Sequence, residues 1–498
     1  LNQYLYPNAL GEANTADVVN LPLPTMIIKE QDCPNPEMLL HSSVNFSKQR
    51  YFPYSLPARG VQKTVREMTD LKWNQEIINQ NASREYLNIL LNLARCELIK
   101  KHVNPACAEF YWAYPRSFSE VDLDRYKVMW HNILEGARKV GHTDESKAAL
   151  MYFDSTQDLA AQSPGIIIVV DIGGGSSDIS VWRHGKILLL NSSLWAGKNM
   201  VGFKDGNGVH SVIYHTVVRE FPEIAGQYQG LSDFQTHLNY VLYSLTDAQL
   251  AQYTQSDRFY KAYFLILYFF SSLIYEIGLQ CKRFVTPDLE SVDICLAGNG
   301  SRFAGWSGGG GSEICSSDSR IYSRILRETM GLGDQVNVRF IPSPKKKWEV
   351  AVGLCEGKEA LLNQKASHEP LLAEDISLGA KVLLSDTLIS ELDKQHSKEA
   401  GILAVDKNRS ELAKFHELLF GILGSSELYT RALRHDPALS NLDALKGELL
   451  GNWDTLVGQV RQKATDNLRD RSSITSSLFI LGMQAVIHKL HKYFSARA

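Results

Sequence analysis

The segment DIGGGSSDIS, Asp171 to Ser180, holds the residues best suited to chemistry in this chain. An apolar, β-branched run, GIIIVVDI, precedes the glycines, and the chain then returns as ISVWRHGKILLL with a turn at His184-Gly185. Glycines let successive backbone N–H groups approach phosphate oxygens closely, and a serine can add a hydroxyl donor. The pattern therefore predicts a phosphate-binding turn between two strands, formed by Gly173, Gly174, Gly175, Ser176 and Ser177.

Asp171, at the end of the apolar strand, is the candidate metal ligand. Mg²⁺ usually keeps several waters and takes only one or two carboxylates, so we expect Asp171 to hold Mg²⁺ through water. A plain hairpin turn would use the same glycines, and the turn by itself leaves both interpretations open. The turn is not a Walker loop, because it lacks the Gly-Lys-Ser/Thr ending. It is not a dinucleotide fingerprint either, because a hairpin follows it and that fingerprint needs a helix.

Four other segments flank this turn. Upstream are FYWAYPRSFSE, a strand ended by Pro115, and HTDESKAALMYF, a helix near whose start Glu145 lies. Downstream are ICLAGNGSRF, a strand that runs into a glycine turn, and EVAVGLCEGKEAL, a further helix. Each has an ordinary interpretation when taken singly: Glu145 as a first-turn helix acid, Arg302 as a surface arginine and Gly353 as a helix-packing glycine.

In this order, over about residues 108 to 361, the segments resemble the ATPase superfamily of actin, heat-shock chaperones and sugar kinases. The resemblance implies an α/β fold: a two-lobed, actin-like ATPase core of the ribonuclease H-like kind. DIGGGSS corresponds to the second phosphate motif of that family, ICLAGNGSRF to its adenosine motif, and the two helical segments to its connecting helices.

The same resemblance implies ATP and Mg²⁺ as cofactors. Glu145 and Asp171 would be the catalytic residues, organising Mg²⁺ and water. Arg302 matches the arginine of the adenosine motif, whose planar guanidinium can lie against adenine. The residues implied for the nucleoside are Gly298, Gly300, Ser301 and Arg302. The residues near the place of the family's adenine-pocket helix are Glu276, Lys282 and Arg283.

The family's first phosphate motif, an Asp-x-Gly-Thr/Ser hairpin, does not occur in residues 1 to 63. Lys48, Arg50 and Lys63 are the candidates for the cation that some members place against the γ-phosphate. Two explanations stay open. The chain is a fragment whose first hairpin lies elsewhere, which its start at Leu1 favours, or the protein is a degenerate ATPase.

Composition excludes several other classes. A formal net charge of -3 gives no reason to expect a nucleic acid or an anionic membrane as partner. Seven cysteines without CxxC or Cys/His clusters predict reduced thiols and a cytoplasmic protein. The apolar run from Ala262 to Tyr275 is shorter than the ~20 residues of a membrane span, so it predicts a buried helix.

Periodicity predicts three regions. Residues 1–160 form the remainder of lobe one and a connecting helix, with helices over about 67–103 and 120–140. Residues 161–366 form lobe two with a helical insertion at about 201–285, and residues 367–498 form an appended, all-helical domain. SGGGGS, residues 307–312, has the composition of a flexible linker, which is either an engineered replacement or a natural glycine loop.

These expectations favour a protein that binds Mg-ATP between two lobes as a conformational switch, with hydrolysis left open. The alternative is a degenerate, non-catalytic scaffold or filament-forming module that binds a protein partner through its C-terminal helices. A metabolite kinase ranks below both, because no motif for a phosphate acceptor is present. A chaperone is poorly supported, because no β-rich substrate domain follows the core.

Overall fold

The structure is a computed structural model that describes most of the chain from Ile77 to Ser495, together with residues 27–30 and 65–68. The larger segments outside the description are 1–26, 31–64, 69–76, 158–164, 227–233, 309–313, 357–363, 396–402, 425–441 and 472–475. The chain divides into two compact units. One comprises Leu1–Tyr111, Asp122–Gly141 and Val217–Leu245, and the second comprises Trp112–Val121, His142–Thr216 and Thr246–Ala498. The candidate site lies entirely within the second unit.

A five-stranded sheet is the centre of the second unit, and its order is β11-β10-β5-β6-β7. The strands are β5 (Ile166–Ile172), β6 (Ser177–Arg183), β7 (Lys186–Ser193), β10 (Ser291–Ala297) and β11 (Asn337–Pro342). β10 is parallel to β5 and β11, whereas β6 is antiparallel to β5 and β7. His184 and Gly185 both have positive φ, 50° and 75°, which suits the two-residue hairpin loop predicted between β6 and β7.

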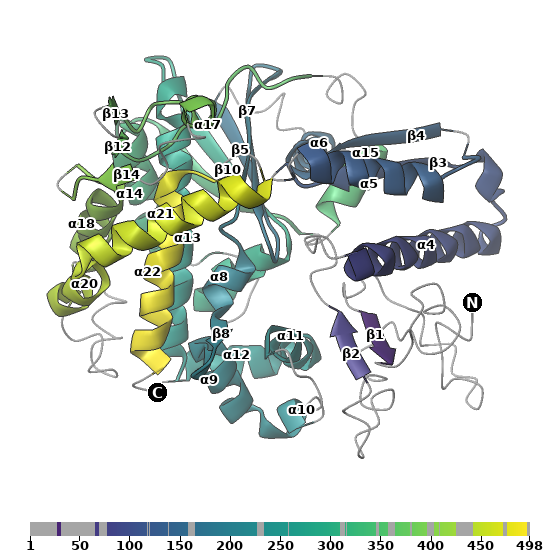
Figure 1. Ribbon diagram of the computed structural model, residues 1–498, viewed down its shortest axis with the longest axis horizontal. Helices are drawn as coiled ribbons and strands as arrows, with labels where there is room; N and C mark the ends of the chain where they lie inside the picture. Colours follow the sequence, from purple (N-terminus) through teal and green to yellow (C-terminus); the bar gives the residue numbers. More distant parts are fainter. Residues whose placement is uncertain are drawn as a thin grey trace. The chain divides into compact units, whose positions relative to one another are not determined.

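Helices cover both faces of this sheet (Figure 1). One face packs against α6 (Glu145–Gln157) and α15 (Glu349–Glu356), where Ile167 and Val169 of β5 share a core with Phe153. On the opposite face Tyr322 of α14 (Ser316–Met330) contacts Phe340 of β11. Because both faces are covered, the central strand β5 is continuously apolar from Ile166 to Val170, as the sequence predicted. The predicted α/β class with a ribonuclease H-like sheet is confirmed.

α6 and α15 cross in direct backbone contact at Gly353. A Cβ atom at this position would lie 1.9 Å from the carbonyl oxygen of Ala148 and 2.9 Å from the nitrogen of Tyr152. Only a residue without a side chain allows the two helices to approach so closely. The helix-packing role considered for Gly353 is therefore what the structure shows.

Between β7 and β10 the chain is mainly helical. The helices are α8 (Gly197–Val201), α9 (Val212–Glu220), α10 (Pro222–Gly226), α11 (Phe234–Ser244), α12 (Asp247–Gln255) and α13 (Phe259–Cys281), followed by the 3-10 turn η3 (Lys282–Phe284). A hairpin of β8 (Phe203–Asp205) and β9 (Gly208–His210) was not predicted, because strands of three residues show no alternation.

α13 is the apolar helix noted in the sequence, and the structure buries it within protein. It is the one described helix that is long and apolar enough to cross a membrane, and its most apolar stretch is fully buried. Every residue from Ala262 to Cys281 is buried. α8, α14, α18 and α22 pack around it, and Figure 1 shows α22 beside it.

Glu276 and Gln280, near the end of α13, are among the polar residues of this helix that bond to distant parts of the chain. Glu276 is fully buried, and it accepts hydrogen bonds from the Ser477 hydroxyl at 2.8 Å and from Gln280 Nε2 at 3.0 Å. Gln280 also accepts from the N–H of Leu371 and donates to its carbonyl. Buried polar groups are costly without such partners, so these bonds fix how the C-terminal region lies on α13. Burial raises the pKa of Glu276 to about 7.

The C-terminal region is helical, as predicted. Its helices are α17 (Ile389–Gln395), α18 (Glu411–Gly424), α20 (Leu442–Leu450), α21 (Trp453–Arg471) and α22 (Leu478–Ser495). It contains in addition a small antiparallel sheet of order β13-β12-β14, with strands Lys381–Leu383, Ile376–Leu378 and Leu403–Val405. These three-residue strands were too short to predict, and they share a core with α17, α21 and α22.

Nearer the N-terminus, the predicted helix boundaries were partly wrong. The described elements are β1 (Ile27–Glu30), β2 (Val65–Met68), α4 (Ile77–Lys100), η2 (Pro105–Cys107), β3 (Glu109–Tyr114), α5 (Glu120–Ile133) and β4 (Lys139–Asp144). The segment from residue 67 begins as a strand paired with β1, and α5 stops at Ile133. Gly136, with φ 80°, follows α5 in a left-handed conformation that ends a helix, and β4 then pairs with β3.

Replacing Gly353 by alanine should force α6 and α15 apart. We expect Gly353→Ala to lower the free energy of unfolding by ~1–3 kcal/mol, as overpacking does. Gly421 is the matched control, because it lies inside α18 and a Cβ there meets no atom within 4 Å. Gly421→Ala should raise stability by ~0.5–1 kcal/mol through helix propensity. Urea denaturation of both variants measures these changes in the free energy of unfolding. A Gly353→Ala protein as stable as the parent would contradict the helix contact.

Glu276 predicts a pH dependence of stability. Its pKa is higher in the folded chain than when unfolded, so its contribution is complete below about pH 4.5 and is lost as pH rises to about 7. The free energy of unfolding of the parent should fall by up to ~3 kcal/mol across this pH range. The Glu276→Gln variant should not show this decrease. Glu135→Gln, on an exposed residue, is the control and should leave the slope unchanged. Parallel slopes for the parent and Glu276→Gln would contradict the prediction.

Candidate nucleotide site

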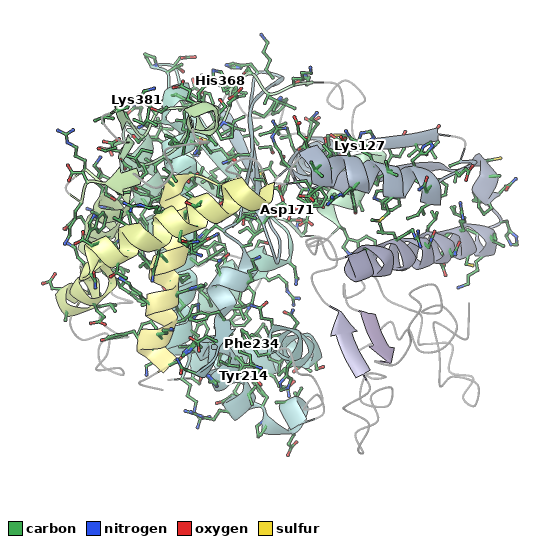
Figure 2. The ribbon with its side chains drawn as sticks, in the orientation of Figure 1. Lys127, Asp171, Tyr214, Phe234, His368 and Lys381 are labelled. Carbon is green, nitrogen blue, oxygen red and sulfur yellow. The ribbon has the colours of Figure 1, made fainter. Side chains whose placement is uncertain are left out.

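The glycine turn and the predicted adenosine segment start at the ends of two adjacent strands. β5 and β10 are parallel neighbours, and Ala297 of β10 pairs with Asp171 of β5. Both strands therefore end at the same edge of the sheet, and the turns that follow them lie together. Asp171, which is half-buried, is labelled in Figure 2.

Gly298 makes the direct contact between the two turns. Its φ is 75°, and a Cβ atom on it would lie 2.1 Å from Asp171 Oδ1 and 2.6 Å from the carbonyl oxygen of Ile172. Gly300 is also close, since a Cβ atom there would lie 2.5 Å from Ile172 Cγ2. Both glycines are therefore required by packing on the end of β5. The structure brings together Asp171, Gly298 and Gly300, as the resemblance implied.

The glycine turn itself is held by backbone hydrogen bonds. The N–H of Gly173 donates to the carbonyl of Ser176 at 2.9 Å, which closes the turn. The N–H groups of Gly197 and Lys198, in α8, donate to the carbonyls of Gly173 and Gly174. The Gly173 N–H is thus engaged within the turn. The N–H groups of Gly174, which is exposed, and of Gly175 are the candidates for phosphate contacts.

The two serines of the turn are buried, and their hydroxyls have protein partners. Ser177 donates to the carbonyl of Trp195, and Ser176 donates to Asp178 Oδ2 at 3.2 Å. A hydroxyl has a single hydrogen to donate. In this conformation both hydroxyls therefore stabilise the fold. The sequence had predicted that they would donate to phosphate. The hydrogen bond from Ser177 to the Trp195 carbonyl could not be predicted from the periodicity of the sequence.

Two carboxylates face the same way at the sheet edge. Asp178 lies directly opposite Asp171 in the β5–β6 register, and residues paired in this way have side chains on one face. Among the described residues no group of three or more His, Cys, Asp and Glu side chains could hold a metal ion. A pair of carboxylates nevertheless suits Mg²⁺, which keeps several waters. Asp178 was not among the residues predicted for the site.

Glu145 is the first residue of α6 and is half-buried. The residue before it is more deeply placed: Asp144 is buried, and its Oδ1 accepts from the Lys147 N–H at 2.9 Å and from the Ser146 hydroxyl. Asp144 therefore caps α6, a role that the sequence analysis missed. The sequence signal for this helix cap was an aspartate directly before Glu-Ser at the start of a helix.

Lys147 and Tyr114 surround this helix start. Burial lowers the pKa of Lys147, whose ammonium donates to the carbonyl of Gln364 at 2.8 Å, while the charge of Asp144 opposes that decrease. Burial and the Asp144 charge raise the pKa of Tyr114. The Trp112 and His142 rings stack at 4.7 Å nearby. The N-terminus of α6 is therefore a firmly packed polar cluster.

The remaining nucleoside residues lie in η4 (Asn299–Gly308). Ser301 is buried, and its hydroxyl donates to the Gly298 carbonyl at 2.7 Å, so it shapes the turn. Arg302 is exposed. Glu349, the buried first residue of α15, accepts from the Gly298 N–H at 3.3 Å. This contact joins the adenosine turn to the second connecting helix, and sequence reasoning did not identify Glu349.

Other residues named from the sequence bond to other parts of the chain or lie beyond the description. Glu276 bonds to Ser477 within the core, and Arg283 donates to the carbonyl of Glu369 at 2.6 Å. The hydrogen bonds of Glu276 and Arg283 stabilise the packing of the chain. Lys48, Arg50 and Lys63 lie outside the described residues, as does most of SGGGGS.

Comparison with known proteins gives similarity to solved structures only. No family model matches the chain, and no curated protein matches it. MreB 5 of Spiroplasma citri bound to AMPPNP is 15% identical, with 66% of this chain and 87% of that chain covered and a TM-score of 0.36. EutJ, an ethanolamine utilization protein from Carboxydothermus hydrogenoformans, is 13% identical, with 60% and 84% covered and a TM-score of 0.31.

A type IV pilus biogenesis complex, PilM-PilN, is 18% identical, with 46% of this chain and 57% of that chain covered and a TM-score of 0.27. The chain spans about half the length of this structure and of MreB5 bound to ADP, of which it covers 50%. The order and directions of the five strands, with helices on both faces, define the fold. They form a sheet of the ribonuclease H-like kind, the kind that the resemblance in the sequence implied.

The Gly298 contact predicts a large effect of a small substitution. Gly298→Ala should lower the free energy of unfolding by ~3 kcal/mol or more, because it adds a clash with Asp171 to an unfavourable positive φ. Gly174→Ala is the control in the neighbouring turn, where a Cβ meets no atom within 4 Å. It should change stability by ~0.5 kcal/mol at most. Equal effects of the two substitutions in urea denaturation would contradict the packing described here.

Proposed function

We propose that the chain binds Mg-ATP at the common edge of β5 and β10 and uses it as a conformational switch. The contact of Gly298 with Asp171 is the observation on which the proposal depends, because it joins the predicted phosphate turn to the predicted nucleoside turn. Phosphate would meet the N–H groups of Gly174 and Gly175, and the nucleoside would lie along Gly298 to Arg302. ATP as the ligand rests on the resemblance of these segments.

Asp171 and Asp178 would hold Mg²⁺ through its waters. Their opposite positions in the β5–β6 register support this role. When bound, Mg²⁺ neutralises phosphate charge. Lys198, exposed on α8 beside the Gly174 carbonyl, adds a positive charge that the sequence analysis did not consider. Glu145 keeps its proposed role of orienting water at the start of α6.

The switch would act through the helices that contact these turns. Glu349 accepts from the Gly298 N–H and begins α15, which crosses α6 at Gly353. A ligand that shifts the Gly298 turn would therefore act on α15 and, through it, on α6. Such packed helix crossings have few alternative arrangements, which is the property that a two-state switch requires.

ATP should stabilise the folded chain in a Mg²⁺-dependent manner. At a ligand concentration one hundred times Kd the gain is ~2.7 kcal/mol, which is measurable as an increase in Tm. Asp171→Asn preserves shape and removes the charge, so ATP should shift its Tm equally with and without Mg²⁺. Asp386→Asn, on an exposed aspartate elsewhere in the same unit, should behave like the parent. An unchanged Tm of the parent at millimolar Mg-ATP would refute nucleotide binding.

A non-catalytic scaffold is the second candidate function, favoured by one observation. The Gly173 N–H and the Ser176 and Ser177 hydroxyls already have protein partners, so the turn is stable without phosphate. In this role the C-terminal helices would bind a protein partner or a second copy. Light scattering with and without ATP distinguishes the candidates: assembly that ignores ATP, with no shift in Tm, supports the scaffold.

A further inference from the structure

One face of the five-stranded sheet changes from apolar to polar between two neighbouring rows of β5, β6 and β7. Val169 of β5 and Leu190 of β7 lie in one row of this face and belong to the core shared with α6. The next row, two residues away on each strand, consists of Asp171, Asp178 and Ser192. Directly paired residues of antiparallel strands have side chains on one face, so these three lie side by side.

Ser192 brings a buried hydroxyl to this polar row. The residue is 3% exposed, and its Oγ has no hydrogen-bond partner within the described part of the chain. A buried hydroxyl that is left without a partner destabilises the fold. Such a group therefore indicates a bound water or ion that completes its hydrogen bonds. The register places this hydroxyl directly beside the Asp178 side chain.

The two carboxylates add negative charge at the same place. Asp178 is 2% exposed, and its Oδ2 accepts a hydrogen bond from the Ser176 hydroxyl at 3.2 Å. Asp171, which is half-buried, lies directly opposite Asp178. Like charges that are directly opposite on neighbouring strands repel each other. A cation beside both carboxylates would replace this repulsion by attraction, and burial strengthens such interactions.

The ligand atoms of this row determine the class of cation. Carboxylate and hydroxyl oxygens suit the hard divalent cations Mg²⁺ and Mn²⁺. Mg²⁺ keeps several of its waters in proteins, and these waters donate hydrogen bonds. A serine oxygen has two lone pairs and accepts such a bond. Asp171 is the most exposed of the three residues, so a hydrated ion approaches the row from the end of β5.

We propose that Asp171, Asp178 and Ser192 form a site for one hydrated divalent cation, and that this site binds the cation before any nucleotide is present. The carboxylates hold the ion through its waters, and Ser192 Oγ accepts a hydrogen bond from one of these waters. The site rests on the proposed function for the role of the two carboxylates. It adds Ser192 as a positioning residue and makes cation binding independent of ATP.

Titration of the nucleotide-free protein with Mn²⁺ tests this site, because electron paramagnetic resonance measures the free Mn²⁺ concentration directly. The parent should bind one Mn²⁺ per chain, and Mg²⁺ should displace it. No binding at millimolar Mn²⁺ would overturn the proposal, even if ATP raised the Tm of the same protein. Mn²⁺ binding by a protein whose Tm does not respond to Mg-ATP would support the cation site and refute nucleotide binding.

Ser192→Ala should lower the affinity for Mn²⁺ about tenfold, as the loss of a group that orients metal ligands does. Ser192→Cys keeps the side-chain volume and should show a similar loss, because a thiol is a weak acceptor. Ser193→Ala is the matched control. The Ser193 hydroxyl is also buried and without a partner among the described residues, but it pairs with Ser177 on the opposite face. Equal affinities of the Ser192→Ala and Ser193→Ala proteins would refute the role of Ser192.

Discussion

The contact between Gly298 and the end of β5 is the constraint on which the rest of the candidate site depends. Parallel pairing sets Ala297 beside Asp171, and the next residue must then turn against the Asp171 carboxylate. A side chain would not fit there. The close approach also orients the Gly298 N–H towards Glu349, so that β5, β10 and α15 meet at one point.

α8 and α13 connect this edge of the sheet to the C-terminal region. α8 is only five residues long, yet its N–H groups bond to the glycine turn. The carbonyl of Asn199, within α8, contacts the ring of buried His491 in α22 at 3.0 Å. One short helix therefore connects the glycine turn to the C-terminal helices.

The polar residues of α13 explain why the C-terminal helices pack where they do. An apolar helix buried on all sides offers little preference for the position of its neighbours. Glu276 and Gln280 remove that freedom, because each bonds to a group at one place in the chain, Ser477 and Leu371. The cost of leaving these groups without partners favours a single arrangement.

The sequence by itself determined the elements of the site. Apolar β-branched runs followed by glycines predicted β5, β10 and the turns after them, because buried strands and glycine turns have local patterns. The hairpin at His184 and the buried nature of α13 follow from local pattern too. Strands of three residues, such as β8, show too little pattern to predict.

Only the tertiary structure decided which of these residues meet. The opposite positions of Asp171 and Asp178 depend on strand register, and the engagement of Ser177 by the Trp195 carbonyl depends on where β7 ends. Glu276 and Ser477 are 201 residues apart, a separation at which no periodicity operates. Such contacts come from the packing of whole elements, which is why the contact of Glu349 with the Gly298 turn appears only in three dimensions.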